Sequence, residues 1–128
     1  MRAINARAVL NRKVTDSTQF IGHTVEVVVE RPIGFKHHSL GFTYLQNYGH
    51  VPGTLSDDGE ELDAYVLGEF EPLERFQGLC IAVLVRLQEK DDKLIVISPA
   101  RQGYSDEQIA ALTEFQEKWA GPNKIVRK

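Results

Sequence analysis

The chain has 128 residues, 42% of them hydrophobic and 26% charged, and its formal net charge is -3 at pH 7. A chain of this length fits one domain with a core large enough to fold without a disulfide or a structural metal. The acidic balance argues against a nucleic-acid partner, because proteins that bind phosphate backbones usually carry a strong positive charge. The single cysteine, Cys80, excludes an internal disulfide. It lies in an apolar run, so we expect an inert, buried thiol in a reducing compartment.

No segment approaches the ~18 apolar residues that a membrane span needs, and the start of the chain shows no signal-peptide core. The sequence also lacks the repeats, low-complexity tracts and linkers that would mark a second domain. The first 13 residues carry four basic side chains and no acid, which favours an exposed arm. We therefore expect an N-terminal arm over 1–19, a single domain over 20–128, a cytoplasmic location and no membrane partner.

Alternation and β-branched runs predict the strands. Residues 24–30 (TVEVVVE) alternate valine with polar residues, as a half-buried strand does, and Pro32 and Gly34 end the run. Three further apolar runs predict strands over 62–67, 78–87 and 94–97. The tight acidic turn at 89–92 makes a hairpin of the last two. Residues 35–61 are rich in turn formers and predict a loop with short strands.

One amphipathic helix is expected over 105–120. Ser105 and Gln108 have the spacing of a capping box, and Gly121 with Pro122 ends the helix. Its apolar face consists of Ile109, Leu112, Phe115 and Trp119. Four or five strands followed by one helix predict a mainly β, α+β fold, a small antiparallel OB-like barrel with the helix packed against it.

The densest cluster of acids is the segment 57–63 (DDGEELD). Neighbouring carboxylates repel each other, and a hard cation such as Mg²⁺ relieves that repulsion through its preference for oxygen ligands. Taken alone, such a loop is also compatible with a solvated turn. An EF-hand calcium loop does not fit, because with Gly59 as the turn glycine Thr54 would be the first ligand and Tyr65 the last.

The sequence on either side of this loop says more about the protein family than the loop itself does. Residues 47–55 (NYGHVPGTL) precede it and residues 64–68 (AYVLG) follow it. Together these segments resemble the soluble family I inorganic pyrophosphatases, whose signature is D-x-D-[PE]-hydrophobic-D-hydrophobic after an N-Y-G-hydrophobic-hydrophobic-P-like stretch. Residues 58–64 (DGEELDA) fit every position except the second aspartate, where this chain has Glu60. The resemblance runs from about Val25 to Trp119.

The resemblance implies metal-dependent hydrolysis of inorganic pyrophosphate to two phosphates, with Mg²⁺ as cofactor and Mn²⁺ as an alternative, in a homo-oligomer. It places Glu60 where the family has its water-activating base. The implied metal-binding residues are Asp58, Asp63, Asp91, Glu89 and Glu30. The implied phosphate-binding residues are Lys36, Tyr48 and Lys93.

This residue composition suits the chemistry. Pyrophosphate is multiply anionic, so an attacking hydroxide is repelled unless cations neutralise the phosphoryl oxygens. Acids hold the metals, two metals ~3.5–4 Å apart lower the pKa of a shared water, and lysines hold the outer oxygens.

Three departures from the family pattern keep a second hypothesis open. Between Lys36 and Tyr44 the family has a hairpin with a phosphate-binding arginine, whereas this chain has only HHSLGFT. The family's Tyr-Lys pair on the last helix has its nearest match in Trp119-Ala120, and Glu60 is longer than the aspartate it replaces. The alternative is a degenerate barrel that binds metal and a phosphorylated ligand without turnover. A third hypothesis, an OB-like nucleic-acid module, is disfavoured by the net charge.

One of the adjacent histidines His37 and His38 is a candidate to take the place of the missing arginine. If the segment is extended, adjacent histidines point to opposite faces, so both could not serve one metal.

Overall fold

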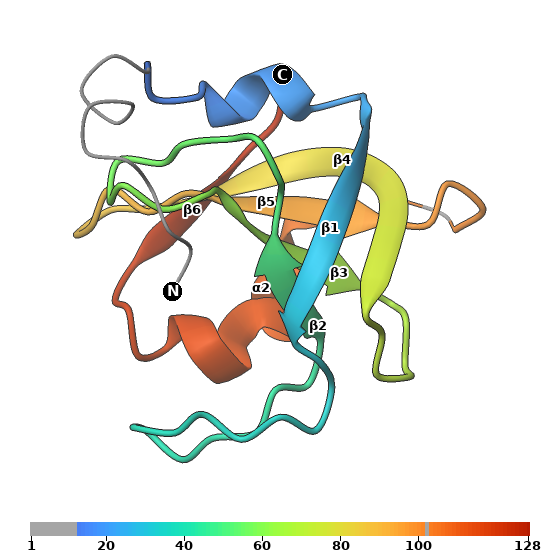
Figure 1. Cartoon of the computed structure of the whole chain (residues 1–128), viewed down its shortest axis with the longest axis vertical. Helices are drawn as coiled ribbons and strands as arrows, with labels where there is room; N and C mark the ends of the chain where they lie inside the picture. The colour runs from blue at the N-terminus through green and yellow to red at the C-terminus, as the bar shows by residue number, and fades with distance from the viewer. Residues whose placement is uncertain (1–12, 102) are drawn as a thin grey trace.

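A computed structural model describes residues 13–101 and 103–128. Within these residues the strands form one sheet in the order β1-β2-β3-β5-β4-β6, and an additional pairing of β1 with β4 closes the first five into a barrel (Figure 1). The strands are β1 Thr24–Arg31, β2 Asn47–His50, β3 Asp63–Leu67, β4 Arg75–Arg86, β5 Lys93–Ile97 and β6 Asn123–Val126. The helices are η1 Ser17–Phe20, a 3₁₀ turn, and α2 Asp106–Glu117. The predicted fold class, a mainly β barrel with one packed helix, is confirmed.

The long strand β4 closes the barrel. Its first part pairs with β1, from Arg75 opposite Val28 to Leu79 opposite Thr24, and its middle pairs with β5. All strand pairs of the described residues are antiparallel except β3 with β5, which run parallel. The parallel pair arises because β4 lies between them in the chain and carries β5 back beside β3.

Strand β5 separates two hydrophobic clusters, one inside the barrel and one between the barrel and α2. All five residues of Lys93–Ile97 are buried, as in a strand covered on both faces. Leu94 and Val96 belong to a cluster with side chains of β1, β3 and β4, whereas Ile95 and Ile97 belong to a second cluster with Ile109 and other residues of α2. The helix therefore covers the outer face of β5.

Helix α2 begins as the sequence predicts. Gln108 N donates to Ser105 Oγ at 3.1 Å and Ser105 N donates to Gln108 Oε1 at 2.8 Å, which confirms the capping box. The helix ends at Glu117, earlier than expected, and a turn follows before Gly121, whose φ of +85° favours glycine. Trp119 lies beyond the helix end and is 52% exposed, so it does not extend the buried face.

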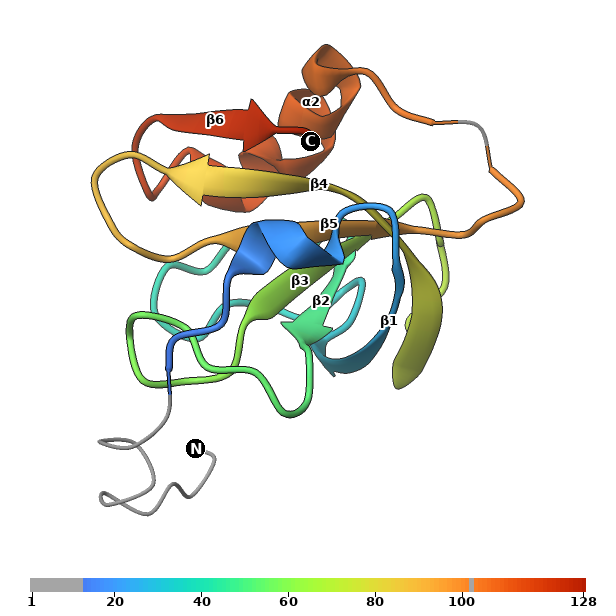
Figure 2. The same ribbon diagram turned by 90° about the horizontal axis from the view of Figure 1, so that it is seen from above.

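Strand β6 was not predicted. It lies beside the second half of β4, on the side where α2 also lies (Figure 2). Figure 1 shows η1 and α2 at opposite ends of the barrel, and the connection from β1 to β2 at the same end as α2. Phe42 of that connection contacts Phe115 and Trp119.

Three further expectations concern burial, membrane and domain limits. Cys80 is fully buried in the barrel, as expected. Within the described part of the chain, the helices are too short or too polar to cross a membrane. Most of the predicted arm lies outside the described residues; its last part hydrogen-bonds to the barrel through Thr15 to Leu55 and Ser17 to Asp92. The boundary between residues 19 and 20 stays a prediction.

Candidate active site

A pocket of about 640 Å³ gathers charged side chains from distant segments. Its acidic lining residues are Glu30, Asp58, Glu60, Asp63, Glu89 and Asp91. Its basic lining residues include Arg31, Arg86 and Lys93, and Tyr48 lines it as well. The fold thus brings together all the metal-binding candidates and most of the phosphate-binding candidates from the sequence.

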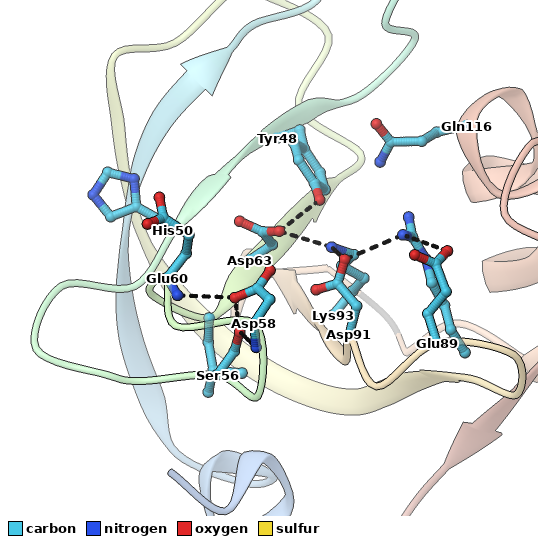
Figure 3. Close-up of polar contacts among 12 residues, drawn as sticks. Tyr48, His50, Ser56, Asp58, Glu60, Asp63, Glu89, Asp91, Lys93 and Gln116 are labelled. Carbon is cyan, nitrogen blue, oxygen red and sulfur yellow. Dashed lines mark hydrogen bonds and ion pairs between the residues drawn. The ribbon is translucent and has the colours of Figure 1, made fainter. Parts of the chain in front are cut away.

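Lys93 lies at the centre of this cluster. The parallel register of β3 and β5 sets Asp63 opposite Lys93, the first residues of the two strands. Lys93 Nζ lies 2.7 Å from Asp63 Oδ2 and 2.8 Å from Asp91 Oδ2 (Figure 3). The lysine is only 1% exposed, whereas the two carboxylates are about one-fifth exposed. A buried ammonium therefore bridges two of the acids that were predicted to bind metal.

Tyr48 completes the environment of Asp63. Its hydroxyl donates to Asp63 Oδ2 at 3.0 Å. Burial, and next the negative charge of Asp63, raise the pKa of Tyr48 well above its usual range, so the phenol stays protonated as a donor. Burial also raises the pKa of Asp91, although the charge of Lys93 opposes this shift.

The acidic loop is a turn ordered by its own side chains. Gly59 has a φ of +86°, which favours glycine. Asp58 Oδ1 accepts the Glu60 N–H at 2.9 Å and is also in contact with Ser56 Oγ (Figure 3). This turn positions both Asp58 and Glu60 on the pocket wall.

His50 was not singled out from the sequence. Its Nδ1 contacts a carboxylate oxygen of Glu30, and its Nε2 lies 3.4 Å from Glu61 Oε1. The ring is 13% exposed and lines the pocket. A signal was present: residue 50 stands at the first hydrophobic position after N-Y-G in the family pattern, and this chain has a histidine there.

Arg86 is the second residue that sequence reasoning missed. Its guanidinium forms two hydrogen bonds with Glu117, Nε to Oε1 at 3.0 Å and Nη2 to Oε2 at 2.9 Å, and Nη1 lies 3.2 Å from Asp91 Oδ2. Glu89 Oε1 lies 3.6 Å from Nη1 of the same guanidinium. Burial lowers the pKa of Arg86, but the hydrogen bonds and charge of Glu117 raise it and, together with the charge of Asp91 and other nearby groups, outweigh burial, so the side chain stays charged.

Glu117 also links Arg86 to the helix and the sheet. Tyr65 Oη donates to Glu117 Oε2 at 2.6 Å, and Gln116 Nε2 donates to Tyr65 Oη at 2.7 Å. Gln116, Trp119 and Ala120 line the pocket from the end of α2. Helix α2 contains no lysine, and Lys118 directly after it does not line the pocket.

The predicted residue Lys36 is not among the residues that line the pocket. It is exposed and pairs with Thr43 through an isolated backbone bridge. His37 and His38 do not point to opposite faces as an extended segment would require. Their rings stack at 5.2 Å, because residues 38–40 form a turn and not a strand.

The donor set suits a divalent metal. All the acids of the pocket offer oxygen ligands, which Mg²⁺ and Mn²⁺ prefer. As the described residues stand, no group of three histidine, cysteine or acidic side chains is close enough to hold an ion. Asp63 and Asp91 instead share the Lys93 ammonium, which carries a single positive charge. The oxygen chemistry of these acids therefore fits a divalent ion, and Asp58, Asp63 and Asp91 are the pocket residues that would hold it.

The fold and the site define an OB-like barrel with a carboxylate-rich pocket. The family model "Inorganic pyrophosphatase" matches residues 18–122, and the chain belongs to this family. It is 37% identical over 71 residues to soluble inorganic pyrophosphatase 2 of Chlamydomonas reinhardtii. The match covers 49% of this chain and 36% of the relative, about a third of the length of that curated protein.

Two solved structures show the same fold. An inorganic pyrophosphatase from Ehrlichia chaffeensis superposes with a TM-score of 0.63 at 15% identity, over 91% of this chain and 92% of the other. An inorganic pyrophosphatase from Neisseria gonorrhoeae superposes with a TM-score of 0.58 at 23% identity, over 85% of this chain and 87% of the other.

Proposed function

We propose that this protein hydrolyses inorganic pyrophosphate to two phosphates with the help of Mg²⁺ or Mn²⁺. The observation that carries the proposal is the meeting of Asp58, Asp63 and Asp91, from three separate segments, in one pocket of a pyrophosphatase-family barrel. A multiply charged phosphate substrate needs such a mixture of metal-holding acids and basic side chains.

The position of each pocket residue suggests its role in the reaction. Asp58, Asp63 and Asp91 would hold the metal with Glu89 as a further acidic ligand, and Glu30 would reach metal-bound water. Bound metal would neutralise phosphoryl oxygens and lower the pKa of the attacking water. Tyr48 already directs its hydroxyl toward Asp63, and it would orient that carboxylate or an oxygen of the substrate.

In the reaction, water attacks one phosphorus and the bond from that phosphorus to the bridging oxygen breaks. Glu60 would accept the proton of the water, because it lines the pocket beside the carboxylates that hold the metal. The leaving phosphate takes up the bridging oxygen. Lys93, released from Asp63 and Asp91 by metal, would contact a phosphate oxygen as a point charge.

Phosphate release from pyrophosphate, measured with Mg²⁺, with Mn²⁺ and with a chelator, tests this proposal. Asp63→Asn should abolish metal-dependent release, since it removes one charge from the metal-holding group. Asp57→Asn is the matched control: it lies in the same loop, is exposed and does not line the pocket. Wild-type protein that binds metal but releases no phosphate would defeat the proposal.

Such a result would favour the degenerate barrel instead. One observation supports this second candidate: Gln116, Trp119 and Ala120 line the pocket at the end of α2, and none of them offers a positive charge to a phosphate group. Cytoplasmic location and assembly into a homo-oligomer stay predictions for either function.

A further inference from the structure

Strand β1 ends in a β-bulge that directs two consecutive side chains to the pocket. Val29 pairs with Gly49 of β2, but Arg31 pairs with Tyr48, so the register shifts and Glu30 is the extra residue. In a regular strand, neighbours point to opposite faces, whereas a bulge changes the direction of a side chain. Glu30 and Arg31 accordingly both line the pocket.

Two tyrosines hold the Arg31 side chain at the pocket wall. Arg31 Nη1 donates to Tyr44 Oη at 2.6 Å. The guanidinium carbon lies 5.6 Å from the centre of the Tyr44 ring and 5.9 Å from that of Tyr48, both within the range of cation–π attraction. Tyr44 is itself fully buried and in contact with Gln116. These contacts orient the guanidinium before any ligand arrives.

Arg31 differs from the other two strong bases of the pocket in its partners. Lys93 is paired with two carboxylates, and Arg86 with Glu117, Asp91 and Glu89. Within the described residues no carboxylate forms an ion pair with Arg31, and its one hydrogen-bond partner is the neutral Tyr44 hydroxyl. Arg31 thus presents a positive charge and free N–H groups to the pocket.

We propose that Arg31 is a phosphate-binding residue of this site, an inference that rests on the proposed pyrophosphate chemistry. A guanidinium offers a planar fork of donors that matches two oxygens of one phosphoryl group. The β1–β2 connection lacks the arginine-bearing hairpin of the family, and Lys36 does not line the pocket. Arg31 supplies the missing contact from the end of β1, where Tyr48 lines the pocket beside it and the buried Tyr44 holds its guanidinium from behind.

The test compares Arg31→Gln with Arg75→Gln. Arg75 is 65% exposed, forms its ion pair with Glu26 and does not line the pocket, so its loss is the matched control for removing one arginine. The readouts are the affinity for inorganic phosphate by calorimetry in the presence of Mg²⁺, the KM and kcat for pyrophosphate, and the melting temperature. Arg31→Gln should weaken phosphate binding and raise the KM by about 10–100-fold, as expected for a hydrogen bond to a charged group. The control should match the wild type.

The outcomes separate this inference from the proposed function. A wild type without turnover would contradict the proposed hydrolysis, while the phosphate titration would still test whether Arg31 binds phosphate. Phosphate affinity unchanged in Arg31→Gln would overturn the inference. If Arg31→Gln does not fold, Arg31→Met decides in the same way, because its unbranched stem keeps the contact with the tyrosine rings. A lower melting temperature with unchanged phosphate affinity would make Arg31 a brace for the tyrosines and also overturn the inference.

Discussion

Asp63 and Lys93 begin two parallel strands, and the register that pairs them places Lys93 Nζ 2.7 Å from Asp63 Oδ2. Asp91 approaches the same ammonium to 2.8 Å. Lys93 therefore neutralises two acids that would otherwise repel each other. The same charge opposes the entry of a divalent ion, so stability without metal and affinity for metal are linked through one side chain.

The first prediction concerns this link. Lys93→Met should destabilise the metal-free protein by about 1–3 kcal/mol, because it removes the cationic partner of Asp63 and leaves Asp91 with Arg86 alone. Mg²⁺ should raise the melting temperature of the variant by more than that of the wild type, since the metal stabilises only the folded state. Thermal melts with and without Mg²⁺ measure both effects. Lys90→Met, an exposed lysine of the same turn, serves as control. A smaller Mg²⁺ shift in Lys93→Met would show that the lysine does not compete with the metal.

Arg86 and Glu117 form the second test. Glu117 is 3% exposed, so Arg86→Met should destabilise the fold by about 3–5 kcal/mol through an uncompensated buried charge. Adding Glu117→Gln should recover part of that loss, and a double-mutant cycle in urea measures the coupling. Arg101 and Glu69 provide a more exposed pair for comparison, with side chains 42% and 26% exposed, where the coupling should stay below about 1 kcal/mol. Equal couplings for the two pairs would contradict the assignment of a structural role to Glu117.

The strands and the helix were largely predictable because local patterns specify them. The valine alternation of β1, the apolar run of β4 and the Ser105 cap of α2 are readable in the sequence, and the structure confirms them. Strand β6 was not readable. Its segment, NKIV, is short and half-buried, and among the residues that the structure describes it pairs with the second half of β4 alone. Tertiary pairing specifies it, not local propensity.

The site was predictable as a set of acids but not as an arrangement. The parallel register that buries Lys93 and the bulge that redirects Arg31 depend on partner strands that no local pattern reveals. Arg86 and Glu117 look like ordinary surface charges in the sequence, and only folding brings them together across 31 positions. Lys36 illustrates the reverse case: its place in the family order predicts a phosphate contact, yet the shortened connection leaves it outside the pocket lining.

Cys80 gives a third prediction. Burial raises the pKa of its thiol to about 11, so only about 0.1% is thiolate at pH 8. Iodoacetamide at that pH should leave the folded protein unmodified and alkylate it within the same time in denaturing urea. Because Cys80 is the one cysteine of the sequence, mass spectrometry reads the result directly. Rapid alkylation of the folded protein would show that the barrel opens around β4 far more often than this packing allows.

The last prediction concerns Glu60, which stands where the family has a shorter acid. A general base must lie within about 2.6–3.2 Å of the water that it activates, and glutamate carries one methylene more than aspartate. The turn at Gly59 positions Glu60 on the pocket wall, so we expect a loop adapted to the longer side chain.

Glu60→Gln keeps the size of the side chain and removes its basicity. It should nearly abolish Mg²⁺-dependent phosphate release while calorimetry shows unchanged metal binding. Glu60→Asp should slow turnover on the order of a hundredfold, as a displacement of about 1 Å does. Glu61→Gln, at the neighbouring position in contact with His50, is the control and should retain most of the activity. Faster turnover in Glu60→Asp would mean that the loop is not adapted and that the aspartate geometry is the productive one, whereas full activity in Glu60→Gln would assign the proton to another acid of the pocket.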